Sequence, residues 1–113
     1  MDEDLKKLRE TCGAVASAVV GKDGLMMHHD VPDEVALDTF GIMSATIVGA
    51  SITAATELGR DEPSRIVVEA GDLNMIIYNA GKRALLVVAV PRDRAMEDVD
   101  KVVQDILAKA KEI

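Results

Sequence analysis

"RIVVEAGDLNMIIYNAGKRALLVVAV", residues 65–90, contains three apolar runs separated by two short turns that carry glycine. Residues 65–70 and 73–79 are rich in β-branched side chains, and the two-residue spacer Gly71-Asp72 between them is typical of a β-hairpin. Residues 84–90 are apolar without alternation and end at Pro91, which predicts a central strand covered on both faces. This stretch therefore predicts three neighbouring antiparallel strands.

The N-terminal part of the chain predicts a helix followed by another hairpin. Leu5, Leu8 and Cys12 are spaced by three and then by four residues, so they form a short apolar stripe on a helix over residues 2–11. Residues 14–20 and 24–29 are short β-prone runs joined by "GKDG", in which Asp23-Gly24 is a strong hairpin signal. We expect Cys12 to belong to the core.

Two further helices complete the predicted order of elements. Asp33 is expected to cap a helix of about 25 residues over 34–58, which Gly59 ends. A last helix from about Ala95 carries apolar side chains at alternating spacings of three and four, at Met96, Val99, Val103, Ile106, Ala110 and Ile113. The prediction is one α+β domain, residues 1–113, with a single five-stranded antiparallel sheet, helices on both faces and the order α-β-β-α-β-β-β-α.

Composition narrows the classes of function. The 113 residues are 49% hydrophobic and 29% charged, as in a folded globular protein, and the net charge is −7. An acidic protein is poorly suited to neutralising phosphates of nucleic acids or anionic membranes, so a neutral or basic protein partner is favoured. The single cysteine excludes an intramolecular disulfide, and no basic segment precedes an apolar run at the N-terminus. We expect a cytoplasmic protein.

Residues 39–56, "TFGIMSATIVGASITAAT", carry no charge over 18 residues, which is close to the length that spans a bilayer. Six of these residues are Ser or Thr, and the flanking Asp38 and Glu57 come without a Lys or Arg anchor. A long buried helix is therefore the favoured interpretation over a membrane span.

Apolar residues of this helix fall on two adjacent stripes when they are placed at 100° per residue. The stripes span an arc of about 220°, whereas a helix resting on one sheet needs little more than 100°. The excess predicts a homodimer through the small-residue stripe, because small residues let two helices approach closely; the alternative is that a terminal helix of the same chain covers it. The bulky stripe comprises Phe40, Met43, Ile47, Ala54 and Leu58, and the small-residue stripe comprises Leu37, Gly41, Ser44, Ala45, Val48, Ile52 and Ala55.

The side chains that could act as nucleophiles, bases or metal ligands do not form a recognisable catalytic pattern. The candidate nucleophiles Cys12, Ser44 and Ser51 have no histidine at local spacing. His28 and His29 are adjacent on a predicted strand, so they point to opposite faces and do not share one metal ion. We expect them to be surface residues, with a partner contact as the alternative. The sequence predicts no catalytic, cofactor-binding or metal-binding residues.

The opening "LKKLRETCGAVASAVVGKDGLMM" (5–27), the long small-residue helix and the late hairpin "IVVEAGDLNMIIYNAGKRALLVVAV" (66–90) resemble the roadblock, or dynein light chain, family. That family includes bacterial and archaeal regulators of Ras-like GTPases, and profilin-like and longin-type domains share its kind of sandwich. The resemblance implies the strand order 2-1-5-4-3, with the strand over 65–70 at an edge. It also implies that two protomers pair through the long helix and this strand.

The edge strand supports pairing, because residues 65–70 are β-branched and lack the Pro, Lys or bulge that usually blunts an edge. The resemblance implies a non-enzymatic homodimeric regulator or scaffold that binds a small Ras-like GTPase. A structural adaptor or sensory module of a larger assembly is the alternative, and neither function involves a cofactor. Exposed arginines near loops are Arg60, Arg65, Arg92 and Arg94, and none is expected to act as an arginine finger. The predicted dimer interface comprises Gly41, Ser44, Ala45, Val48, Ile52, Ala55, Ile66, Val67 and Val68.

Overall fold

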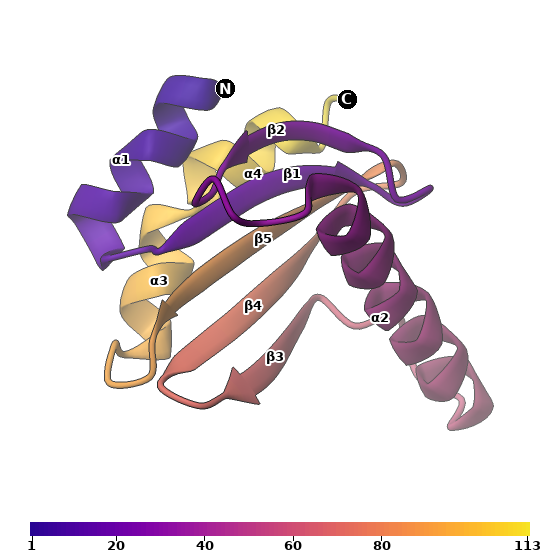
Figure 1. Cartoon of the computed structure of the whole chain (residues 1–113). Helices are drawn as coiled ribbons and strands as arrows, with labels where there is room; N and C mark the ends of the chain where they lie inside the picture. The colour runs from indigo at the N-terminus through magenta and orange to yellow at the C-terminus, as the bar shows by residue number, and fades with distance from the viewer.

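A computed structural model describes all residues, 1–113, and shows one five-stranded antiparallel sheet with helices on both faces (Figure 1). The strands lie in the order β2-β1-β5-β4-β3. This arrangement confirms the predicted α+β fold class and strand order. The strands are β1 (Ala16–Gly21), β2 (Met26–Asp30), β3 (Arg65–Ala70), β4 (Leu73–Ala80) and β5 (Ala84–Pro91).

Strand β5 lies at the centre of the sheet, as its unbroken apolar sequence predicts. Every residue from Ala84 to Val90 is buried, and β5 pairs in continuous register with β1 on one side and β4 on the other. Each fully buried Leu or Val side chain contributes about 1.5–3 kcal/mol relative to exposure. Side chains of β5 therefore contribute to the buried clusters on both faces of the sheet.

Both predicted hairpins are present. Ala70 pairs with Leu73, so the β3–β4 turn contains two residues, and Gly71 at its first position has φ 62°, which glycine adopts without strain. The β1–β2 loop is one residue longer than a two-residue turn, because the Gly21 N–H donates to the Leu25 carbonyl at 2.8 Å. Strand β2 consequently begins at Met26 rather than at residue 24.

Helices α1 (Asp2–Cys12), α3 (Met96–Val102) and α4 (Gln104–Ala110) cover one face of the sheet (Figure 1). The single C-terminal helix that the spacing predicts is interrupted at Val103, which ends α3 and precedes α4. Val103 is itself buried, so the interruption keeps the apolar side chains of both short helices on the sheet. Ile113, which the spacing places on the packed face, is 40% exposed.

Helix α2 (Leu37–Glu57) starts three residues later than predicted. Ala36 occupies the N-cap position without a side-chain cap, so the prediction that Asp33 caps this helix is wrong. The reason is a separate turn before the helix, in which the Val35 N–H donates to the Pro32 carbonyl at 3.0 Å. The helix ends as predicted, with Gly59 in the left-handed region at φ 66°.

Helix α2 packs on the other face of the sheet through its small residues. Gly41, Ser44 and Val48 are its buried residues, and a Cβ atom at Gly41 would lie 2.6 Å from the Gly24 carbonyl oxygen. The small-residue stripe therefore faces the chain's own sheet, and the expectation that it lacks a partner within the domain is wrong. Small residues do allow a close approach here, but to the β1–β2 turn rather than to another helix. The cluster beneath the helix comprises Ala18, Val20, Val48, Ile77, Leu85 and Val87.

Two glycines within α2 give a matched test of this contact. Gly41→Ala is expected to destabilise the fold by about 1–3 kcal/mol, because the new methyl group collides with backbone that cannot move away freely. At Gly49 a Cβ atom would meet nothing within 4 Å, so Gly49→Ala should stabilise the helix by about 0.5–1 kcal/mol. Urea unfolding of both variants measures the difference, and equal stabilisation by the two would contradict the contact.

Candidate functional site

The outward side of α2 carries exposed apolar side chains. Only 17% of the most apolar 18-residue window of α2 is buried, which corrects the expectation of a long buried helix. Met43 is 49% exposed and Leu58 is 74% exposed, while Phe40 and Ile47 are partly covered. The outer stripe, as we name it, consists of Phe40, Met43, Ile47, Ala54 and Leu58, of which Phe40 and Ile47 also pack partly against the cluster beneath the helix.

Helix α2 has 21 residues, and its most apolar 18-residue window has a mean hydropathy of 1.4, so by length and composition alone it could cross a membrane. One such helix is weak evidence for insertion, because core helices of soluble proteins reach the same values. The threonines of α2 increase its apolar character. The hydroxyl groups of Thr46, Thr53 and Thr56 each donate to the carbonyl four residues earlier, at 2.8, 3.2 and 2.9 Å. These hydroxyls are satisfied by the helix itself, so the helix surface has fewer polar groups seeking partners than its Ser and Thr content suggests.

Beside α2, part of the sheet face is left without a covering helix. Ile66 and Val68 of β3 pair with Ile77 and Met75 of β4, and all four side chains face the α2 side of the sheet. The main contacts of α2 are with β1, β2 and β4, and Figure 1 shows its C-terminal half standing away from β3. The apolar side chains of this part of the sheet, Ile66, Val68 and Met75, are therefore only half-buried.

Strand β3 also has an unpaired edge. It pairs only with β4, and the register from Arg65 to Ala70 contains no bulge. Its outward N–H and C=O groups form a ready template for another strand. The outer stripe, Ile66, Val68 and this open edge together form the candidate interaction surface.

The predicted interface residues divide into two groups in the structure. All the predicted interface residues of α2 lie on the side of the helix that faces the sheet, where they are buried or half-buried. They are Gly41, Ser44, Ala45, Val48, Ile52 and Ala55. On β3, Ile66 and Val68 lie on the candidate surface, whereas Val67 points to the opposite face. Helical periodicity does not show which of the two apolar stripes faces the sheet. The available signal is the presence of one glycine in the hairpin turn, Gly24, and another in the helix, because two glycines allow close contact.

The candidate nucleophile Cys12 is a core residue, as predicted. It is 0% exposed, its thiol donates to the Leu8 carbonyl at 3.2 Å, and burial raises the pKa of the thiol. The thiolate form, which is the reactive one, is therefore disfavoured. Ser51 donates to the Val48 carbonyl at 2.8 Å, and Ser44 is buried on the side of α2 that faces the sheet. These contacts give each group a structural role.

The histidines lie on the edge strand β2, as the resemblance implied. Nδ1 of His28 is 3.0 Å from a carboxylate oxygen of Asp2 on α1, while His29 points to the other face and is exposed. No group of three His, Cys, Asp or Glu side chains is placed to hold a metal ion. Next to the histidines, Arg9 of α1 pairs with Asp30 and holds the pKa of that carboxyl below its usual range. The β2 edge is thus tied to α1 at both of these positions.

Two of the four arginines near loops form ion pairs with carboxylates of the same chain. Arg65 pairs with Asp100 of α3, which also accepts a hydrogen bond from the Tyr78 hydroxyl at 2.6 Å, and Arg92 pairs with Glu69 at 3.4 Å. Burial, followed by the bond to Asp100, raises the pKa of Tyr78. This cluster fastens β3 to α3 from the face opposite α2, so it steadies the edge strand without covering its open side.

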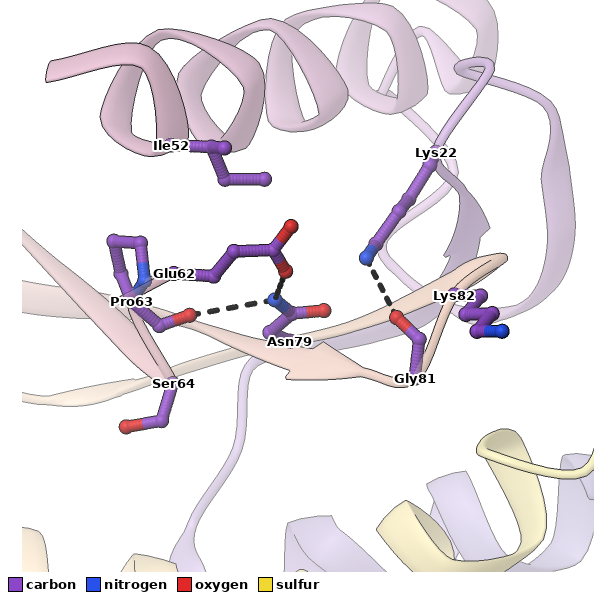
Figure 2. Close-up of a pocket in the computed structure, with 8 residues that line it drawn as sticks. All are labelled: Lys22, Ile52, Glu62, Pro63, Ser64, Asn79, Gly81 and Lys82. Carbon is purple, nitrogen blue, oxygen red and sulfur yellow. Dashed lines mark hydrogen bonds between the residues drawn. The ribbon is translucent and has the colours of Figure 1, made fainter. Parts of the chain in front are cut away.

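A polar pocket of about 580 Å³ lies between α2 and the turn end of the sheet (Figure 2). The Asn79 side-chain amide donates to Glu62 at 3.2 Å and to the Pro63 carbonyl at 3.4 Å, and Lys22 donates to the Gly81 carbonyl at 2.5 Å. These bonds brace the loop that leads into β3 and join the two turns. The other lining residues, Ile52, Ser64 and Lys82, include no histidine or cysteine that would pair with the serine in acid–base chemistry.

The family model of the Roadblock/LC7 domain matches residues 1–89. The chain belongs to the Roadblock/LC7 family. It is 31% identical over 87 residues to the uncharacterized protein MJ0310 of Methanocaldococcus jannaschii, a match that covers 77% of this chain and 76% of that protein.

Two solved structures show how widely this Roadblock/LC7 fold is shared. MglB of Myxococcus xanthus superposes with a TM-score of 0.89 at 16% identity, covering 98% of this chain and 91% of that one. A structure described as MglB with a tetrameric arrangement gives a TM-score of 0.85 at 20% identity, covering 97% and 84%. At these identities the likeness is one of fold.

The burial of Cys12 in this Roadblock/LC7 domain predicts a slow thiol. Reaction of the native protein with a chromogenic disulfide reagent at neutral pH should be at least about 100-fold slower than reaction in denaturing urea, because both access and the thiolate fraction are reduced. Absorbance of the released thiolate measures both rates. A native rate similar to the unfolded one would show that Cys12 is accessible and would reopen a redox or nucleophilic role.

Proposed function

We propose that this protein is a non-enzymatic homodimer that binds a small Ras-like GTPase in the cytoplasm and modulates its nucleotide state. Membership of the Roadblock/LC7 family supports the proposal, since bacterial and archaeal members of the family include regulators of such GTPases. The observation that carries it is the outer stripe of α2 beside the open edge of β3. A surface of this kind is what one protomer needs to pair with another.

A second copy fits this surface better than a lipid bilayer does. The open edge of β3 needs backbone hydrogen bonds, which another strand supplies and lipid does not. An antiparallel pair of β3 strands about a two-fold axis makes the contact self-complementary and extends the sheet into the second protomer. The same axis brings the two outer stripes together over Ile66 and Val68. The net charge of −7 also opposes attraction to anionic lipids.

Regulation by such a dimer follows from differential affinity. A GTPase exchanges between conformations of its switch segments, and a protein that binds one of them more tightly shifts the population towards it. Arg65 and Arg92 are held by carboxylates of their own chain, which favours this mechanism over insertion of either arginine into a nucleotide site. The dimer then acts as a rigid platform rather than as a donor of catalytic groups.

The dimer predicts different results for neighbouring α2 positions. Met43→Glu should raise the dimer dissociation constant by about tenfold or more, because it places two carboxylates in an apolar seam. Ile42→Glu is the matched control: Ile42 is 51% exposed against 49% for Met43 but lies on the flank that faces the β1–β2 turn. Light scattering after size exclusion measures both, and a monomeric wild type would overturn the dimer.

Val48→Glu separates folding from assembly. Val48 packs against the chain's own sheet and is only 3% exposed. A carboxylate there should therefore destabilise the protomer by about 3 kcal/mol or more. Thermal unfolding should therefore show a large loss for Val48→Glu and little for Met43→Glu. A folded, monomeric Val48→Glu would instead favour the small-residue stripe as the seam.

The GTPase partner predicts nucleotide-dependent binding. Ras-like GTPases of the source organism, each loaded with GDP or a non-hydrolysable GTP analogue, should bind the immobilised protein with at least about a fivefold preference for one state. Met43→Glu should weaken this binding if the platform must be dimeric, whereas Ile47→Leu should retain it. Equal binding or none for every GTPase would contradict the proposal, and a stable nucleotide-free assembly would favour the adaptor role.

A further inference from the structure

A hollow of about 370 Å³ lies at the N-terminal end of α2, where the helix meets the β1–β2 turn. Two large apolar side chains stand at this hollow: Leu25 is 64% exposed and Ile42 is 51% exposed. A monomeric surface seldom leaves such a pair uncovered without a reason. The complete lining comprises Asp23, Gly24, Leu25, Met26, Asp38 and Ile42.

Backbone contact fixes the shape of the hollow. Gly24 has φ 92°, and a Cβ atom on it would lie 3.2 Å from the Cα of Ile42. Gly41 meets the Gly24 carbonyl even more closely. The turn and the helix are therefore in close contact, with the backbone and side chain of Ile42 against Gly24. A ligand that enters the hollow meets a preformed surface and does not need to order it.

The rim of the hollow is acidic. Asp23 and Asp38 contribute carboxylates, and neither takes part in an ion pair. One Asp23 oxygen accepts the Leu25 N–H at 3.0 Å, which leaves the other oxygen available. The neighbouring cation, Lys22, does not line the hollow and donates instead to the Gly81 carbonyl (Figure 2). An apolar centre with an uncompensated acidic rim is complementary to a basic amphipathic segment.

We propose that this hollow docks a basic segment of a partner protein. One apolar side chain of the segment lies between Leu25 and Ile42, and flanking Lys or Arg side chains pair with Asp23 and Asp38. The site lies apart from the proposed dimer seam, because Ile42 is rotated about 100° around α2 from Met43, towards the β1–β2 turn. Each protomer carries one such site, and the inference does not depend on a GTPase being the partner.

The test uses the full chain and a short capped peptide of leucine and lysine, with leucine at helical spacings of three and four. Amide shifts in ¹⁵N spectra should change first at Leu25, Met26 and Ile42. A peptide with glutamate in place of lysine should not bind, and neither should one with serine in place of leucine. Shifts spread evenly over the acidic surface would overturn the proposal, because they would indicate non-specific attraction.

Paired variants separate the hollow from general charge. Asp23→Asn with Asp38→Asn should weaken peptide binding about fivefold, whereas Asp93→Asn with Glu97→Gln, the same charge change at the opposite end of the sheet, should leave it within about twofold. Equal losses would overturn the proposal.

An apolar pair of variants tests the centre of the hollow. Leu25→Ser should weaken binding about tenfold, and Val15→Ser, at a residue 46% exposed elsewhere, should not. If the wild type self-associates and Leu25→Ser does not, the hollow binds a second copy of this chain, and the proposal is overturned. Loss of peptide binding with an intact dimer distinguishes this inference from the proposed function.

Discussion

The contact between Gly41 of α2 and the Gly24 carbonyl of the β1–β2 turn determines how the second helical layer sits on the sheet. Because neither glycine has a side chain, the helix rests directly on the backbone of the turn. The contact is near the start of α2, so the N-terminal half is held while the C-terminal half extends away from β3 (Figure 1). The exposed outer stripe, the uncovered sheet face and the acidic hollow all follow from this one placement.

The two faces of the sheet consequently serve different purposes. The cluster between the sheet and helices α1, α3 and α4 has 17 buried residues, whereas the cluster between the sheet and α2 has six. Since buried apolar area supplies most of the stability of a small domain, the first face contributes most to folding. The second face is left with apolar surface in excess of what one protomer can cover. The proposed dimer would cover part of this excess apolar surface.

Sequence reasoning recovers the elements whose signals are local. The unbroken apolar sequence of β5 predicts its central position in the sheet, and Gly71-Asp72 predicts the β3–β4 turn. Both predictions succeed because each depends only on a few adjacent residues. The start of α2 was missed since the Pro32–Val35 turn takes up the residues that resemble a cap. The interruption at Val103 was missed since the hydrophobic spacing continues across it, and only the docking of α3 and α4 on the sheet reveals two helices.

The candidate site was harder to predict than the fold because it depends on which of two apolar stripes lies inward. Periodicity gives the width of the apolar arc of α2, and this width indicates that the helix has more apolar surface than one sheet covers. It does not show which side of the helix faces the sheet. The direction comes from tertiary contact at Gly41, a feature that a hydrophobicity pattern treats as neutral. The strand part of the predicted interface depends on the alternation of a single edge strand, and the structure places Ile66 and Val68 on the α2 side of that strand; their role in a dimer stays a prediction.

The two edges of the sheet differ in a way that favours the β3 edge for the proposed dimer. At β2, Arg9 pairs with Asp30 and Asp2 contacts His28, so side chains of α1 brace that edge and place charge beside it. At β3, the corresponding bracing by Arg65 and Asp100 comes from the far face and leaves the edge itself open. Two copies that join through β3 therefore remove both open edges at once and leave braced β2 edges at the ends. A closed dimer, rather than an extending fibre, is the assembly that this asymmetry favours.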